Sequence, residues 1–363
     1  MKFTVDTLEF KSAFERAFKV TGVKTIPSLE NVRIKKIEND CHLLASNCEQ
    51  YVDIVVFSQS KDSVEFSFSD SKAILKAMKF FTGEFIELDC DENEVTISCG
   101  GKKAKQRIIC DDFPEFPIVG DTVHNSFVYT NTRLKKRLKS VKYAVSTEEH
   151  RKILMGVCFN GNDLVAVDGY RLAINSDADL AVTTPFVVPP AALKTVTEIM
   201  GKNITITTDS KHMFISDGQA AFITRLFDGE YFNYSTAINQ AKTGYRQSCF
   251  VESTEFENSL KYLRTFNKAK GSMIVHWYAD KLGVKNSSGY FESNVDIMGE
   301  MDIEIAFNLD YMLEALGQFS GRVKILLSSA TAPILITDED GDNNVALVLP
   351  IRAKETMFVK SVA

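Results

Sequence analysis

The sequence predicts an α+β protein made of three tandem copies of one domain, each with two helices packed on antiparallel sheets. This fold class is predicted by two sets of strand-to-helix segments, each of which recurs about every 120 residues. A hairpin pattern follows each segment of the second set. Strand-like runs predominate, and the helices are too few to cover both faces of a parallel sheet.

The first set joins a short strand-like run to an amphipathic helix. Its opening residues are Phe3, Phe127 and Phe250, at offsets of 124 and 123 residues. Polar cap-type residues follow each one, and then an apolar pair at i, i+4, which lies on one helix face. These pairs are Phe10 and Phe14, Leu134 and Leu138, and Phe256 and Leu260.

The second set aligns on Phe68, Val188 and Phe307, at offsets of 120 and 119 residues. Helix-start signals stand at Ser69, at Pro189 or Pro190, and at Asn308, and the stop signals are Gly83, Gly201 and Gly321. Hairpin patterns follow at 85–98, 204–216 and 323–337. The period is domain-sized, longer than the roughly 20–50 residues of solenoid repeats. We therefore expect domains over 1–124, 125–246 and 247–363.

Positive charge is concentrated in one segment of an acidic chain. The formal net charge is −6, yet six of the sixteen residues in 131–146 are Lys or Arg and none is acidic. On a helix, Leu134, Leu138, Val141 and Val145 fall within about 60° of one another and form the core face. The opposite face carries Lys135, Lys136, Lys139 and Lys142. Such a face is either simply solvated or suited to a phosphate backbone.

Other helices show a weaker basic surplus, with Lys72 and Lys76 in the helix expected over 70–82 and Arg264 in the one over 252–268. Seven scattered cysteines include no CxxC pair, which argues against a disulfide framework or a zinc site. The N-terminal segment has no apolar core of a secretory signal, and no run approaches the roughly 18 apolar residues that span a bilayer. We expect a cytoplasmic protein without membrane contact.

The rival class is a metal-dependent hydrolase or nuclease that uses the acidic loop TDEDGDNN at 337–344. Asp338, Asp340 and Asp342 supply oxygen ligands at alternate positions, with Glu339 between them. The later Glu of a calcium loop is absent, and the stretch lies between two strand-like runs, so a solvated hairpin loop is the better interpretation. No histidine pair, phosphate loop or nucleophile elbow is present. We expect no catalysis and no cofactor.

Several motifs resemble one bacterial family. The stretch GVCFNGNDLVAVDGYRLAI (156–174) is the most specific of them, and MKFTV, DDFPEFP (111–117), IEIAFNLDYMLEAL (303–316) and ALVLPIRA (346–353) add to it. The chain resembles the β subunit of bacterial DNA polymerase III, the sliding clamp, over nearly its whole length.

The resemblance implies a DNA clamp fold that closes a ring as a head-to-tail homodimer around double-stranded DNA, without sequence specificity. It implies a bacterial processivity factor whose partners are the replicative polymerase α subunit, the clamp-loader complex, and other polymerases and repair proteins that dock through short peptides. At the dimer interface, Leu263 and the 104–108 edge are candidates.

Peptides of these partners bind an apolar pocket between the second and third domains in the family. Carried over by position, the pocket residues are Arg151, Val167, Gly169, Tyr170, Arg171, Leu172, Asn308, Tyr311, Leu347, Val348, Leu349, Pro350, Ile351 and Arg352. The expected DNA-contacting residues are Lys24, Lys72, Lys76, Lys135, Lys136, Lys139, Lys142, His150, Lys152 and Arg264.

The chain departs from the family pattern at three places. Tyr170 stands where many members have His, and Asn239 stands where a pocket proline is expected. The segment KETMFVKSVA (354–363) continues beyond the usual end of the family. Because this tail begins beside the expected pocket, we expect it to alter or cover the pocket.

Overall fold

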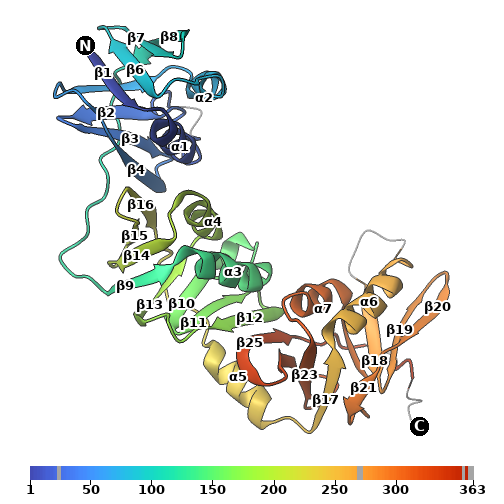
Figure 1. The fold of residues 1–363 in the computed structure, drawn as a ribbon. Helices are drawn as coiled ribbons and strands as arrows, with labels where there is room; N and C mark the ends of the chain where they lie inside the picture. Colours follow the sequence, from blue (N-terminus) through green and yellow to red (C-terminus); the bar gives the residue numbers. More distant parts are fainter. Residues whose placement is uncertain (23–25, 268–272, 354–355, 359–363) are drawn as a thin grey trace. The chain divides into compact units, whose positions relative to one another are not determined.

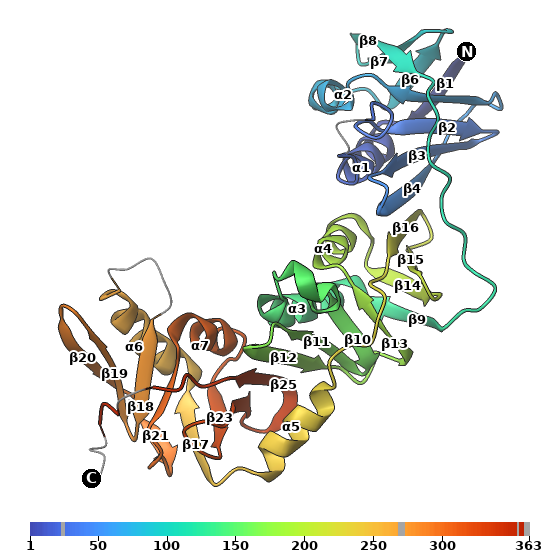
Figure 2. The same ribbon diagram turned by 180° about the vertical axis from the view of Figure 1, so that it is seen from behind.

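The computed structural model describes residues 1–22, 26–267, 273–353 and 356–358. It divides into two compact units, Met1–Lys135 with Val188–Leu226, and Lys136–Val187 with Phe227–Ala363. Each unit contains antiparallel sheets with helices packed on them (Figures 1 and 2). The predicted α+β class is therefore confirmed.

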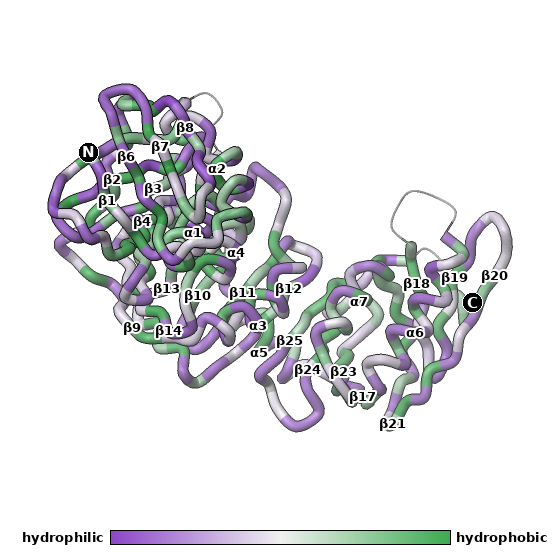
Figure 3. Tube along the Cα trace, turned by 45° about the horizontal axis from the view of Figure 1, so that its top comes forward, coloured by the Kyte–Doolittle hydropathy of each residue, from purple (hydrophilic) through white to green (hydrophobic). Residues whose placement is uncertain are grey.

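One twelve-stranded sheet organises the first unit, in the order β1-β6-β7-β8-β5-β2-β3-β4-β16-β15-β14-β9. Its strands alternate buried and exposed positions, as an antiparallel sheet with one covered face requires; the alternation of hydropathy along the chain is visible in Figure 3. The strands are β1 (Lys2–Asp6), β2 (Arg33–Ile37), β3 (Asp40–Ser46), β4 (Gln50–Phe57), β5 (Val64–Phe68), β6 (Phe85–Cys90), β7 (Glu94–Cys99), β8 (Lys102–Ile109), β9 (Asn125–Thr130), β14 (Asn203–Thr208), β15 (His212–Ser216) and β16 (Ala220–Arg225).

Three helices belong wholly to this unit: α1 (Thr7–Phe18), α2 (Ser71–Met78) and α4 (Pro190–Ile199). The Asp6 carboxylate starts α1 by accepting the backbone N–H groups of Leu8 and Glu9. Helix α1 packs on β3, β4 and α2. Its buried Phe14 meets Phe68 edge to face, with 5.4 Å between ring centroids.

The second unit contains two sheets, a nine-stranded one in the order β13-β10-β11-β12-β25-β24-β23-β17-β21 and a four-stranded one in the order β20-β19-β18-β22. The first consists of β10 (Val157–Gly161), β11 (Asp163–Val167), β12 (Arg171–Ser176), β13 (Val182–Val188), β17 (Gln247–Glu252), β21 (Ile297–Gly299), β23 (Arg322–Leu327), β24 (Ile334–Asp338) and β25 (Gly341–Val348). The second consists of β18 (Ile274–Tyr278), β19 (Lys281–Asn286), β20 (Gly289–Asn294) and β22 (Ile305–Asn308).

Helices α5 (Tyr234–Thr243), α6 (Ser253–Arg264) and α7 (Leu309–Leu316) belong to the second unit, with the 3-10 helices η1 (Lys142–Ala144) and η2 (Glu149–Met155). The division between the units lies within α3 (Asn131–Val141). Helix α6 packs against α7, and its Phe256 lies 5.0 Å from the fully buried Trp277, measured between ring centroids. Among the described residues, no helix is long and apolar enough to cross a membrane.

Both strand-to-helix sets and the three hairpins are confirmed. The predicted apolar pairs on α1, α3 and α6 are all buried, and each predicted hairpin is an antiparallel pair. Helix α2 starts from Asp70, one residue later than predicted from Ser69, because the Asp70 carboxylate accepts the N–H of Ala73 at 2.8 Å. Helix α5 was not predicted from the sequence.

Both predicted domain boundaries, near 124 and 246, fall in connections between elements. The sheets nevertheless continue across them, since β4 pairs with β16 and β12 pairs with β25. This pairing explains why contacts group the chain into two units, whereas the sequence repeat divides it into three domains.

A buried lysine holds part of the first unit together. Lys36 is 1% exposed, and its ammonium donates to the backbone carbonyls of Glu38, Ser60 (2.6 Å) and Asp62 (2.8 Å). The Phe3 ring lies 5.7 Å from the same nitrogen. A buried ammonium is tolerated only when its three donors are satisfied. We call the three carbonyls around Lys36 the cage; their bonds attach the loop after β4 to β2.

We expect Lys36→Met to lower the free energy of unfolding by about 2–4 kcal/mol, because three backbone carbonyls lose the buried charged donor that they share. The measurement is urea unfolding followed by circular dichroism. The matched control is Lys35→Met. The Lys35 ammonium lies 3.9 Å from Glu65, and both side chains are about 40% exposed, so the loss there should stay below about 1 kcal/mol. Equal losses for both variants would contradict the role of the cage.

Candidate functional site

The turn between β11 and β12 starts the candidate pocket. Asp168 accepts the backbone N–H groups of Tyr170 (2.9 Å) and Arg171 (3.0 Å) through one carboxylate oxygen. Gly169 has φ +92°, a conformation that side chains with a Cβ rarely adopt. The Asp-Gly pair therefore folds this turn locally and places Tyr170 at its tip, 53% exposed.

Pairing of β12 with β25 forms the wall of the pocket. Leu172 is opposite Leu347, and Arg171 is opposite Val348. Because side chains alternate along a strand, Leu172 and Leu347 share one face of the sheet and the other pair shares the opposite face. Leu172 and Leu347 belong to the apolar cluster that includes Tyr234 and Ile238 of α5, whereas Val348 is buried among the residues that include Phe307 and Met312.

A cavity of about 300 Å³ lies on the Leu172 and Leu347 side. Its surface is almost entirely apolar, which suits the side chains of a bound peptide rather than a charged metabolite. The residues that line it are Arg151, Leu154, Val167, Gly169, Tyr170, Arg171, Leu172, Phe232, Ala237, Pro333, Leu347 and Leu349.

The structure brings eight of the fourteen predicted pocket residues to this cavity: Arg151, Val167, Gly169, Tyr170, Arg171, Leu172, Leu347 and Leu349. The other six do not line it. The Asn308 side chain accepts backbone N–H groups at the start of α7. Val348 is fully buried on the opposite face of the sheet, and the Tyr311 ring stacks on the Arg171 guanidinium. Pro350 pairs with Phe307, Ile351 donates to Ala306, and Arg352 follows beyond them.

Four lining residues were not predicted from the sequence: Leu154, Phe232, Ala237 and Pro333. Phe232 and Ala237 reach the cavity because Asn233 starts α5 by accepting the N–H of Thr236. The i, i+4 pair Tyr234 and Ile238, both buried, is the sequence signal that would have found this helix. Asn239, at the expected proline position, is exposed on α5 and does not line the cavity.

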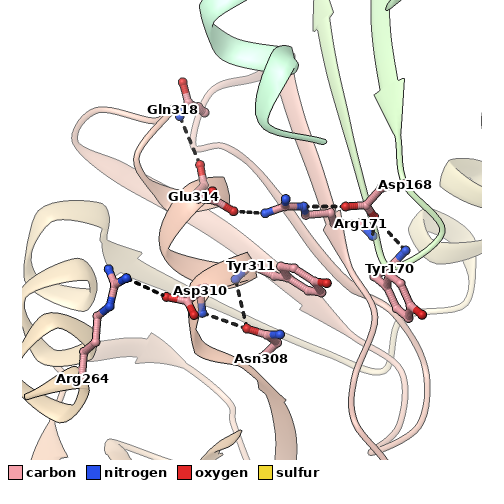
Figure 4. Close-up of polar contacts among 9 residues, drawn as sticks. All are labelled: Asp168, Tyr170, Arg171, Arg264, Asn308, Asp310, Tyr311, Glu314 and Gln318. Carbon is pink, nitrogen blue, oxygen red and sulfur yellow. Dashed lines mark hydrogen bonds and ion pairs between the residues drawn. The ribbon is translucent and has the colours of Figure 1, made fainter. Parts of the chain in front are cut away.

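Arg171 connects the turn to α7 (Figure 4). Its Nε lies 2.9 Å from Asp168, and its Nη1 is bonded to Glu314 of α7. The guanidinium also stacks on Tyr311, 4.4 Å from the ring centroid, and on Tyr143 at 5.4 Å. The Tyr311 ring lies 5.9 Å from that of Tyr170, so the tip of the turn packs against the same helix.

The electrostatics of this network are consistent with a permanently charged arginine. Burial alone lowers the pKa of Arg171, but its bonds to Glu314 and Asp168 outweigh burial and raise the pKa above its usual value. Burial raises the pKa of Tyr143 and, less strongly, that of Tyr311. Both phenols therefore stay protonated at neutral pH, and neither is an acid or base candidate.

The predicted DNA-contacting residues that the structure describes are all exposed. They are Lys72 and Lys76 on α2, Lys135, Lys136 and Lys139 on α3, Lys142 on η1, His150 and Lys152 on η2, and Arg264 on α6. Lys24 lies outside the described residues. Arg264 is paired with Asp310 at 3.3 Å (Figure 4), and His150 lies 3.4 Å from Glu148.

Helix α3 has the two faces predicted for it. Leu134, Leu138 and Val141 are buried, and Val145 lies beyond the helix end. Arg137 is the exception among the basic residues of this segment, because it is 4% exposed and donates to Asn175 Oδ1 (2.6 Å) and to the carbonyl of Asn162 (2.8 Å). We call the four exposed lysines Lys135, Lys136, Lys139 and Lys142 the lysine face.

The acidic loop of the rival interpretation is the turn between β24 and β25. Asp338 accepts the N–H of Asn344 at 3.0 Å, and Glu339 pairs with Arg322 at 3.1 Å. Among the described residues, no group of three His, Cys, Asp or Glu side chains is placed to hold a metal ion.

The described part of the C-terminal tail, residues 356–358, is not at the cavity. Met357 and Phe358 donate their backbone N–H groups to Glu304, ahead of β22, and none of these residues lines the pocket. The expectation that the tail covers the pocket is therefore wrong for these three residues, because the Glu304 carboxylate, just before β22, binds Met357 and Phe358 there.

Comparison with known proteins identifies the fold and shows which proteins the chain is similar to. The structure of the DNA polymerase III β subunit from Thermotoga maritima matches 97% of this chain and 99% of its own, with a TM-score of 0.84 and 22% identity. A ligand-bound sliding clamp from Pseudomonas aeruginosa matches 97% of this chain and 100% of its own, with a TM-score of 0.87 and 20% identity. The fold is that of DNA sliding clamps.

Sequence relatives agree. Residues 129–233 match the family described as the DNA polymerase III beta subunit, central domain, and residues 285–352 match its C-terminal domain. The beta sliding clamp of Staphylococcus epidermidis is 22% identical over 379 residues, which cover 97% of this chain and 99% of that protein. By fold and by sequence, the chain is similar over nearly its whole length to the β sliding clamps, the β subunits of bacterial DNA polymerase III.

We expect Arg171→Leu to lower the free energy of unfolding by about 3–5 kcal/mol, because it leaves Asp168, 12% exposed, without its cation. Glu314→Gln should cost less than about 1 kcal/mol, since Glu314 is half exposed. Thermal and urea unfolding of the two variants measure the contrast. A larger loss for Glu314→Gln would show that the helix contact, not the turn, governs this network.

Proposed function

We propose that this chain is a DNA sliding clamp, a processivity factor of DNA polymerase III with no catalytic activity of its own. The lysine face carries the proposal: an acidic chain with the clamp fold exposes four lysines on one helix face. Lysines that contact phosphates give affinity without sequence specificity, which a protein that slides on duplex DNA needs. The clamp works in the bacterial cytoplasm.

The proposed clamp encircles double-stranded DNA as a head-to-tail homodimer. Within the described strands, β20 is at one end of its sheet, and β8 pairs along 102–107 only with β7. Such open edges suit pairing between two chains. Lys102, Lys103, Lys105 and Arg107 make the β8 edge basic, and Glu292 of β20 supplies an opposite charge. Leu263 is fully buried in its own domain, so it does not contribute.

A clamp of this kind tethers its partners through the apolar cavity. The replicative polymerase α subunit, the clamp-loader complex, and other polymerases and repair proteins dock there through short extended peptides. Leu349, Phe232 and Tyr170, exposed by 37%, 47% and 53%, form an apolar and aromatic rim around the cavity.

Retention on DNA tests the ring. Light scattering should give a mass near twice the 40.6 kDa of one chain. After loading onto nicked circular DNA by the clamp loader of the same organism, the protein should resist a high-salt wash and be lost when the circle is cut. A mass of one chain together with salt-sensitive binding to circles and linear DNA alike would overturn the clamp proposal.

The contribution of the lysine face is tested by measuring DNA affinity at several salt concentrations. The variant combines Lys135→Ala, Lys136→Ala, Lys139→Ala and Lys142→Ala. The slope of log affinity against log salt should fall by about 0.9 for each phosphate contact removed. A matched variant removes four exposed lysines elsewhere, Lys61, Lys211, Lys281 and Lys285, and should leave the slope unchanged. An unchanged slope for the first variant would remove this helix from the DNA interface.

We expect Leu349→Asp to weaken peptide binding roughly 30-fold or more, because a charge at the rim replaces an apolar contact worth about 2 kcal/mol. The probe is a labelled peptide from the C-terminus of the polymerase α subunit of the same organism, followed by fluorescence anisotropy. Met298→Asp, at an exposed apolar position outside the cavity, is the control. Equal affinity of the two variants would place the peptide elsewhere.

A further inference from the structure

After the pocket, the chain crosses to the four-stranded sheet. Leu349 donates its N–H to the carbonyl of Tyr170 at 2.8 Å, Pro350 pairs with Phe307, and Ile351 donates to Ala306 at 2.7 Å. Figures 1 and 2 both show this segment leaving β25 and running beside β18. The tail therefore reaches the outer sheet along β22.

Glu304 is the polar anchor at the end of this path. Its two carboxylate oxygens accept consecutive backbone N–H groups, that of Met357 on Oε1 and that of Phe358 on Oε2, the latter at 3.0 Å. His276 Nδ1 lies 3.0 Å from Oε1. The Glu304 side chain is only 5% exposed, so these bonds form away from water, where charge-assisted hydrogen bonds are strong.

The sheet provides a groove for the two side chains. Across it, Ala306, His276, Gly283 and Glu292 stand opposite one another in successive strands. The flanking Leu282 and Val284 of β19 belong to the core, so Gly283 lies on the outer face.

Gly283 leaves the space that the tail occupies. A Cβ there would lie 2.8 Å from the Phe358 ring and 3.0 Å from the Met357 sulfur. The φ of Gly283 is not positive, so room rather than backbone strain requires glycine. The Phe358 ring also meets Tyr290 of β20, with 6.4 Å between centroids in an edge-on arrangement.

We propose that Glu304, His276, Gly283 and Tyr290, which we call the outer-sheet groove, form a second peptide-docking site and that the chain's own residues 356–358 occupy it as an intramolecular ligand. The groove takes an extended peptide that presents two consecutive backbone N–H groups to a carboxylate and a Met-Phe pair to the sheet. None of its four residues lines the apolar cavity. The inference goes beyond the clamp function and does not depend on it.

The chemistry makes the groove selective for a peptide. Two adjacent backbone N–H groups bond the two oxygens of one carboxylate. An arginine guanidinium can make the same bidentate contact, but it does not also place a Met-Phe pair on the sheet. When the tail leaves, Glu304 loses both amide donors. The covalent link keeps the local concentration of the tail high, so a free peptide competes poorly while the tail is present.

The test uses the labelled peptide KETMFVKSVA, residues 354–363, and the chain that ends at Ala353. We expect saturable binding to the shortened chain and at least tenfold weaker binding to the full chain, whose groove is filled. In the shortened chain, Glu304→Gln removes one acceptor and Gly283→Val fills the groove, so each should weaken binding at least tenfold. Glu300→Gln, at an exposed acid outside the groove, should leave it unchanged.

Absence of saturable binding to the shortened chain would overturn the proposal, as would binding that neither Glu304→Gln nor Gly283→Val changes. Binding that is lost on Leu349→Asp but kept on Gly283→Val would assign the peptide to the apolar cavity and would equally overturn it. Failure of the clamp proposal is a separate outcome, because it appears as loss of retention on circular DNA.

A measurement on the full chain guards against poor folding of the shortened one. Hydrogen exchange followed by mass spectrometry should show protected amides at Met357 and Phe358, and Gly283→Val should raise their exchange rate at least tenfold. The segment around Trp277 should keep its protection, which confirms that the domain is folded. Fast exchange of both amides in the unmodified chain would overturn the proposal.

Discussion

The pairing of β12 with β25 is the constraint on which the second unit depends. It brings residues 171–175 beside residues 344–348 and so joins segments about 170 positions apart in one sheet. Because side chains alternate along a strand, the two faces of the sheet carry different side chains. One face carries Leu172 and Leu347 toward α5 and the cavity, and the other carries Arg171 and Val348 toward α7. Without this register the apolar wall would be dispersed.

Arg171, which the pairing of β12 with β25 places opposite Val348, is the centre of a network of ion pairs and ring contacts. The guanidinium of Arg171, at the start of β12, binds the turn that precedes this strand and the helix that follows β22, and two tyrosines stack on it. Its charge is compensated locally by Asp168 and Glu314, so it stabilises the wall of the cavity. The lysine face is the opposite case, because its four charges are exposed and no acidic residue lies within α3. The chain thus separates cations that pair within the structure from cations that stay exposed on one helix face.

Much of the fold was predictable, because its signals are local. Phe10 and Phe14, or Leu134 and Leu138, predict a helix face from their spacing alone, and the burial of these residues confirms it. The Asp-Gly turn was predictable for the same reason. Helix α5 was not predicted, although Tyr234 and Ile238 carry the signal, since it has no counterpart in the two repeated sets of strand-to-helix segments. The buried role of Arg137 was not predicted, because composition does not reveal that Asn175 and Asn162 lie beside it.

The sequence by itself determined the repeated strand-to-helix units, the two faces of α3 and the resemblance to sliding clamps, because each depends on residues close together in the chain. Only the tertiary structure decided what lines the cavity, since Leu154, Phe232 and Pro333 come from separate segments. It also decided where the tail binds. Glu304 and Phe358 are 54 positions apart, and only the path of the chain after β25 brings the carboxylate to the backbone amide. Long-range pairing supplies such contacts, and no local pattern records them.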